Sequence, residues 1–130
     1  MRVQDDAERE IIDLLGRALS NPGMVSAFLP EKWSPPKGLH VTVQSDGTPV
    51  TSRGWTRETI RVTVHGAVKS QVSKIGRAVD GFLLSPMSGH FMAVQPGTGL
   101  FVSPDSKVGG FVASATYRVA KPRIIIGGRK

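Results

Sequence analysis

The sequence predicts an α+β domain in which two helices pack on one face of a mostly antiparallel β-sheet. Two segments repeat apolar residues every three or four positions, as helices do, and several others alternate apolar with polar residues, as half-buried strands do. The segments follow one another as helix, hairpin, helix and strands, and 15 Gly and 9 Pro among 130 residues exclude an all-helical bundle. The length fits one domain, which we place at residues 1–120, followed by a basic extension at 121–130.

Two segments have the apolar spacing of amphipathic helices. Residues 5–20 form the first predicted helix, and Asn21-Pro22-Gly23 ends it. The second ends at Ser85-Pro86, because a residue before proline avoids helical backbone. Its apolar stripe consists of Val68, Val72, Ile75, Val79 and Phe82. Between the helix and the first strand, residues 24–29 are a short apolar run, for which an extended segment and one helical turn both remain open.

Two alternating segments predict an antiparallel hairpin. In residues 39–44 and 60–65 every second side chain is Leu, Val or Ile, which is typical of a strand with one buried face. The connection, residues 45–57, is polar and rich in turn-forming residues. It exceeds the two to five residues of ordinary hairpin loops, and long loops are often functional.

The last third of the chain predicts three further strands. Residues 92–95 and 100–103 are short strand candidates, and Pro96-Gly97-Thr98-Gly99 between them predicts a hairpin turn. Residues 111–119 alternate apolar and polar side chains and predict a long final strand.

The net charge of +7 is unevenly distributed. Residues 51–77 contain six basic residues and one acid, and residues 107–130 contain six basic residues and no acid. Such a surface favours polyanions or acidic protein partners. The first ten residues are acidic and polar, unlike a signal peptide, and no apolar run approaches the 18 residues that would predict a membrane span. The absence of Cys excludes disulfides, thiol catalysis and Cys-based metal sites.

The sequence shows no catalytic motif, and we expect neither an enzyme nor a bound metal or cofactor. A catalytic site combines a nucleophile, a base and a group that stabilises charge, and no such set is recognisable. His40 and His65 fall at the polar positions of predicted strands and are expected to be exposed, and His90 follows Ser-Gly in a loop. Gly97-Thr98-Gly99 lacks the Lys-Ser/Thr of a phosphate-binding loop.

Two segments are candidates for contact surfaces. Arg53, Trp55 and Arg57 interleave charge with an aromatic ring, which suits phosphate contacts with base stacking, a protein interface, or a Trp that folds back on the core. Residues 85–110 place Met and Phe side chains among Gly and Pro, and such side chains form an adaptable contact surface or fold over the core.

Several stretches together carry a resemblance to a known family. They are the opening helix Asp6–Leu19, the Val25–Pro30 segment VSAFLP, the strand LHVTVQSDGTP, the strand ETIRVTVHG with the helix after it, and the closing strand ASATYRVAKP. In this order they resemble the tail terminators, which are minor tail proteins of bacteriophages with long non-contractile tails. The resemblance covers most of the chain and rests on the succession of elements rather than on a short motif.

The resemblance implies a virion protein, made in the bacterial cytoplasm, that forms a hexameric ring at the head-proximal end of the tail. The ring would end polymerisation of the tail tube protein and join the tail to the head–tail connector, while DNA passes through it without sequence-specific binding. On this basis we expect an interface with a neighbouring subunit or the tube at Arg53, Trp55, Arg57, Met87, Phe91 and Met92. Candidates for a DNA-facing lumen or basic surface are Arg61, Lys69, Lys74, Arg77, Lys121 and Arg123. A neck adaptor of the same phages, and a small basic nucleic-acid-binding protein, remain the alternatives.

Overall fold

The computed structural model describes residues 7–34, 38–45, 50–52, 55–85 and 93–122. The helices of this part are α1 (Ala7–Ala18) and α2 (Lys69–Leu84), and a 3-10 turn spans Pro22–Met24. The strands are β1 (Val25–Ser26), β2 (His40–Ser45), β3 (Val50–Ser52), β4 (Trp55–Gly66), β5 (Ala93–Pro96), β6 (Phe101–Pro104) and β7 (Phe111–Pro122).

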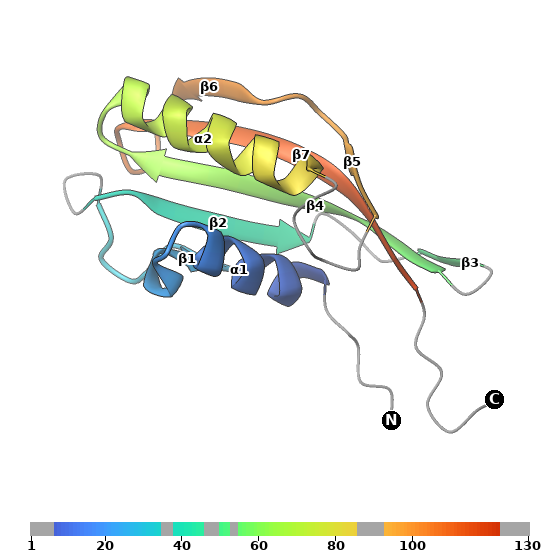
Figure 1. Ribbon diagram of the computed structural model, residues 1–130. Helices are drawn as coiled ribbons and strands as arrows, with labels where there is room; N and C mark the ends of the chain where they lie inside the picture. The colour runs from blue at the N-terminus through green and yellow to red at the C-terminus, as the bar shows by residue number, and fades with distance from the viewer. Residues whose placement is uncertain (1–6, 35–37, 46–49, 53–54, 86–92, 123–130) are drawn as a thin grey trace.

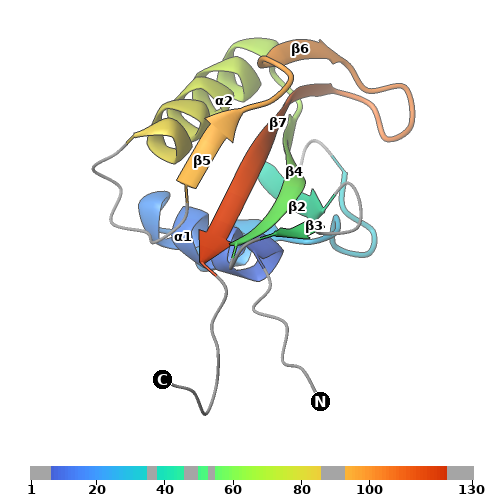
Figure 2. The same cartoon turned by 90° about the vertical axis from the view of Figure 1, so that its right-hand side faces the viewer.

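All seven described strands belong to one sheet. Its order is β1-β2-β4-β7-β5, with β3 paired to β4 and β6 paired to β7. The β1–β2 pair is parallel and the other pairs are antiparallel. Both helices lie on the same side of this sheet, as Figures 1 and 2 show. The predicted α+β class, with its mostly antiparallel sheet, is therefore confirmed.

Both predicted helices are present, and their apolar sides form the core with one face of the sheet. Of the predicted stripe of α2, Val72 and Val79 are buried and Ile75 and Phe82 are partly buried, but the prediction is wrong for Val68, which precedes the helix and is 47% exposed. The largest fully buried side chains are Tyr117, Ile11, Leu15, Ile60, Leu83, Val41, Val43, Val64, Val72, Val79 and Val119. Helix α2 lies close to β7 because residue 76 is glycine: a Cβ there would lie 2.9 Å from the Cβ of Ala113. The Tyr117 hydroxyl of β7 donates a hydrogen bond to Asp80 of α2 at 2.6 Å, and burial together with this bond raises the pKa of Tyr117.

The predicted hairpin of residues 39–44 and 60–65 is confirmed as β2 and β4, with His40 opposite His65. The prediction of one continuous loop over residues 45–57 is wrong. Residues 50–52 form β3, which pairs with the first three residues of β4. These residues of β4 also pair with the end of β7. The segment is polar and has no apolar alternation, but it forms a strand because it has a hydrogen-bonded partner strand on each side.

The prediction of a hairpin turn at Pro96-Gly97-Thr98-Gly99 is also wrong. Strands β5 and β6 both pair antiparallel with β7 and therefore run in the same direction. Pro96 lies opposite Tyr117 and Phe101 opposite Ser114, so residues 97–100 oppose only residues 115–116 and form a bulge. The Gly97 amide donates to the Thr116 carbonyl at 2.9 Å, and a Cβ at Gly97 would lie 2.6 Å from the Thr116 Oγ1. The turn-forming residues thus interrupt the pairing alongside β7 between β5 and β6, and they do not reverse the direction of the chain.

In the short apolar run at residues 24–29, Met24 ends the 3-10 turn and Val25–Ser26 form β1, which adds to the edge of the sheet beside β2. Strand β7 continues to Pro122, two residues into the segment that we placed outside the domain.

Candidate functional site

The face of the sheet that the helices leave uncovered is mostly polar. Along β4, Ile60, Val62 and Val64 are buried toward the helices, whereas Arg61 between them is exposed. Directly paired residues of antiparallel strands point to the same side, so the register identifies the other members of this face. We call it the helix-free face; it carries two apolar residues of β7, Val112 and Ala120, and otherwise His40, Thr42, Gln44, Arg57, Thr59, Arg61, Thr63, His65, Ser114, Thr116 and Arg118.

One end of the helix-free face is covered by loops and is called the histidine end (His40, Thr42 and His65). His40 is only 4% exposed, and its Nε2 lies 2.7 Å from the Ser26 Oγ. The Ser26 hydroxyl donates its hydrogen to the Phe28 carbonyl at 2.6 Å, so it accepts from a protonated Nε2 of His40. The segment after β1 is thereby fixed against β2.

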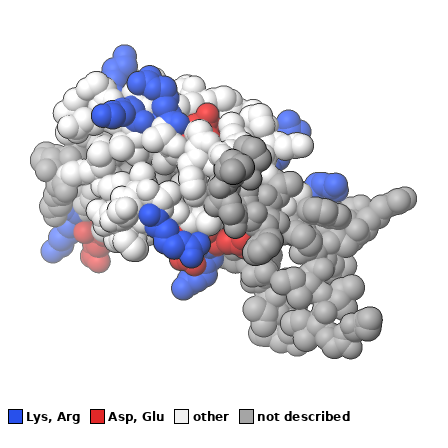
Figure 3. Space-filling view, viewed as in Figure 1, with Lys and Arg blue, Asp and Glu red and all other residues white. Residues whose placement is uncertain are grey.

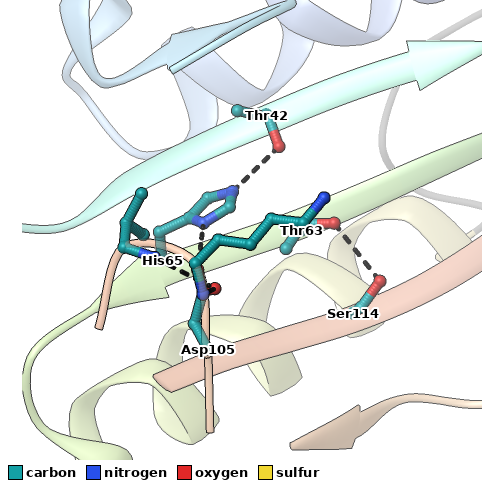
Figure 4. A network of polar contacts seen from close by, with 7 residues as sticks. Thr42, Thr63, His65, Asp105 and Ser114 are labelled. Atoms are coloured by element: carbon teal, nitrogen blue, oxygen red, sulfur yellow. Dashed lines mark hydrogen bonds and ion pairs between the residues drawn. The ribbon is translucent and has the colours of Figure 1, made fainter. Parts of the chain in front are cut away.

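His65 joins two further elements to this end of the face (Figure 4). Its Nε2 lies 3.1 Å from the Thr42 Oγ1, and its Nδ1 lies 3.9 Å from the Asp105 Oδ2. The Trp33 ring packs edge-on against the imidazole, with ring centroids 5.9 Å apart. Asp105 also caps its own turn, because its Oδ1 accepts hydrogen bonds from the amides of Lys107 and Val108.

His40 is therefore buried and His65 is largely covered, with a side chain that is 12% exposed, so the prediction of exposed strand histidines is wrong for both. The loops that carry Trp33 and Asp105 cover the polar side of the strands, which alternation along the chain could not indicate. Burial lowers the pKa of His40. Burial also lowers the pKa of His65, against the opposing effect of the Asp105 carboxylate, and His40 lowers it further. Both imidazoles are neutral at pH 7.

Asp105, His65 and Thr42 follow one another in the order carboxylate, imidazole, hydroxyl. A nucleophilic hydroxyl has to reach a substrate, but Thr42 is only 8% exposed. Its strand is paired on both sides, with Ser26 and with Thr63, so its backbone belongs to the sheet rather than to an oxyanion hole. The arrangement suits the attachment of loops to the sheet better than it suits catalysis.

The other end of the helix-free face is exposed and basic, and is called the arginine end (Arg57, Arg61 and Arg118). All three arginines are exposed. Arg118 of β7 lies opposite Thr59 of β4, and so stands diagonally between Arg57 and Arg61. Diagonal neighbours in such a ladder are about 7–8 Å apart. The β4–β7 pair thus brings Arg57 and Arg61 from the first basic segment beside Arg118 from the second, although α2, β5 and β6 lie between them in sequence.

The structure separates the basic residues that the sequence grouped together. Lys69, Lys74 and Arg77 are exposed on α2, on the helix-bearing side, where Figure 3 shows basic side chains over this helix. Arg61 lies on the opposite face of the sheet, beside Arg57. Arg118 was missed by the sequence prediction, although a charged residue at a polar position of the predicted last strand was a usable signal.

The remaining predicted contact residues cannot be assigned to either surface. Trp55 and Lys121 belong to β4 and β7 by their backbone, and their side chains lie outside the described part of the structure. The other predicted contact residues, Arg53, Met87, Phe91, Met92 and Arg123, lie outside the described residues altogether.

Two aromatic side chains are exposed at opposite edges of the sheet. Phe28, just after β1, is 72% exposed, and Phe101 of β6 is 48% exposed. Strand β1 forms one edge of the sheet, and β6 pairs with β7 near the other.

Within the described residues, no three His, Asp or Glu side chains are grouped closely enough to hold a metal ion. Neither described helix has the length and apolar character needed to cross a membrane. Known protein families offer no match to this chain, and no curated protein is similar to it.

Proposed function

We propose that this protein is the repeating subunit of a ring that caps the head-proximal end of a phage tail tube, where it ends tube polymerisation and joins the tail to the head. The observation that carries the proposal is the pair of exposed phenylalanines, Phe28 and Phe101, at opposite edges of one sheet. The succession of helix, hairpin, helix and strands agrees with the resemblance to tail terminators.

A closed ring with one subunit type needs two different patches on each subunit, which meet head to tail. Phe28 and Phe101 offer such patches, because they belong to different elements and lie at different edges. Aromatic side chains contribute large buried areas at interfaces and are enriched among their anchors. Contact between the Phe28 edge of one subunit and the Phe101 edge of the next would repeat until the ring closes.

A ribbon of β-structure offers a further surface for the tube or for a neighbouring subunit. Strand β3 and the paired ends of β4 and β7 continue beyond both helices (Figure 1). A narrow ribbon of strands is marginally stable by itself, and packing against a partner stabilises it. Arg57 and the backbone of Trp55 belong to this ribbon, so it includes part of the interface that the sequence predicted.

The ring is tested by measuring the native mass of the protein and of edge variants over a concentration series. We expect a wild-type species of six times 13.9 kDa. Phe28→Asp and Phe101→Asp should each abolish it, because each removes one of the two patches. An equimolar mixture of the two variants should form only a two-chain species, since one intact edge remains on each. Val68→Asp, at a residue that is 47% exposed on the helix-bearing side, is the control and should leave the ring intact.

A wild-type protein that stays monomeric at all concentrations, or edge variants that assemble normally, would contradict the ring. The capping role is tested separately by adding the protein to polymerising tail tube protein and measuring tube lengths by electron microscopy. Shorter tubes are expected of a terminator. Unchanged tube lengths, together with binding to the head–tail connector, would instead assign the protein to the neck adaptors.

A further inference from the structure

The arginine end combines three charged side chains with neutral hydrogen-bonding groups. Arg57 and Arg61 are four residues apart on β4, which corresponds to about 13 Å along a strand, and Arg118 stands between them on β7. Thr59 lies opposite Arg118 and is partly exposed. Thr116 lies opposite Arg61 but is only 8% exposed, and its Oγ1 accepts a hydrogen bond from the Thr98 amide at 2.7 Å, so it takes no part in this surface. Gln44 and Gln95 extend these two rows on the flanking strands.

The charged side chains of the arginine end are all basic. Among the described strand residues of the helix-free face, none is Asp or Glu. Glu58, which lies between Arg57 and Thr59 in the sequence, points to the other side, where its carboxylate accepts a hydrogen bond from the Ser45 hydroxyl at 2.8 Å. Asp105 lies at the histidine end, against His65. The arginine end is therefore complementary to an anionic partner.

The side chains of this end favour a phosphate backbone over an acidic protein. Arg, Thr and Gln are the residue types that contact phosphate and sugar groups of nucleic acids. In duplex DNA one strand carries a phosphate about every 3.4 Å of axis, so a row of arginines about 13 Å long is long enough to contact more than one phosphate. The helix-bearing side, in contrast, mixes basic side chains with acidic ones (Figure 3).

We infer that the arginine end of the helix-free face binds the phosphate backbone of duplex DNA, independently of its sequence. The inference goes beyond the proposed ring and does not depend on it, because the three arginines belong to one subunit. Arg57 and Arg118 carry the contact, with Arg61 as the third charge and Thr59 as a neutral donor.

The experiment measures binding of a short fluorescent DNA duplex to the full chain by anisotropy, at a concentration where the chain is a monomer. The double variant Arg57→Gln/Arg118→Gln should weaken binding at least about tenfold and reduce the salt slope by about two, since each phosphate contact contributes about one. The matched control, Lys74→Gln/Arg77→Gln on α2, removes the same charge from the other side and should change the affinity by less than about threefold. A duplex of scrambled sequence should bind equally well.

Three results would overturn the inference. The first is the absence of binding at low salt, and the second is an equal loss of affinity in the α2 control, which would indicate net charge alone. The third is displacement of the duplex by poly-L-glutamate at an equal concentration of charges, which would assign the face to an acidic protein. Unfolding curves of both double variants establish that any loss of binding is not a loss of folding.

Discussion

The two ends of the helix-free face differ although their strands have the same alternating pattern. At the histidine end, loops cover the polar side chains, and His40, Thr42 and His65 find partners within the protein. At the arginine end, no described loop contact covers Arg57 or Arg118, and both are exposed. The comparison shows that a polar position in a strand has no fixed role. Its role depends on what packs above it.

The difference leads to different expected costs of substitution. A buried polar group that loses its partner is strongly destabilising, whereas an exposed one is not. The histidine end should therefore control stability and its pH dependence, and the arginine end should control binding. Four predictions test this division, from the largest expected effect on stability to the smallest.

Replacing Thr42 by Val should lower the free energy of unfolding by about 1–3 kcal/mol, because the Nε2 of the largely covered His65 loses its hydrogen-bond partner. The measurement is chemical denaturation of the monomer at pH 7. The matched control is Thr59→Val, the same substitution on the same face at the arginine end, which should stay within about 0.5 kcal/mol of the wild type. Equal losses in the two variants would show that the two ends contribute equally to stability, which would contradict the prediction.

Acidification should destabilise the protein through the buried histidines. Their pKa values are lowered in the folded state, so between the folded and unfolded pKa values the unfolded chain binds more protons. The free energy of unfolding should therefore decrease as the pH falls through 6.5, the ordinary histidine value, by at most about 1.4 kcal/mol per pH unit for each histidine. Denaturation curves between pH 7.5 and about 5, above the usual range of carboxylates, measure it.

The same curves for the variant His40→Gln/His65→Gln identify the source of the pH dependence. We expect a flatter profile in this range, whatever the variant's absolute stability. A profile with the wild-type slope would show that other groups titrate there.

Replacing Asp105 by Asn should lower the pKa of His65 further, because the carboxylate is what raises it against burial. The amide oxygen can still accept the turn hydrogen bonds from Lys107 and Val108, so the loss of stability should stay below about 1 kcal/mol. NMR titration of the His65 ring measures the pKa. A rise in that pKa, or no change, would show that Asp105 does not act on the imidazole.

Replacing Arg118 by Gln should leave the free energy of unfolding within about 0.5 kcal/mol of the wild type, because the side chain is exposed. The same variant should bind the DNA duplex more weakly. Thermal and chemical denaturation measure the first effect and anisotropy the second. A marked loss of stability would mean that the arginine end, like the histidine end, has a structural role.

The local pattern of the sequence determined which segments form helices and which form the main strands. Helical spacing at residues 68–82 and alternation at residues 39–44, 60–65 and 111–119 depend only on side-chain direction along a helix or a strand, and the structure has these elements where the pattern placed them. The sequence also indicated an interruption at residues 96–99, but it did not indicate what kind of interruption this is. Turn-forming residues mark an interruption, and whether it becomes a reversal or a bulge depends on which strand lies alongside.

The tertiary structure alone decided the character of the helix-free face. Burial of His40 and His65 depends on loops that return from distant parts of the chain to place Trp33 and Asp105. The arginine end depends on the antiparallel register of β4 and β7, which places Arg118 between Arg57 and Arg61. Neither result follows from spacing along the chain, because contacts between distant segments are set by the packing of the whole sheet and its loops.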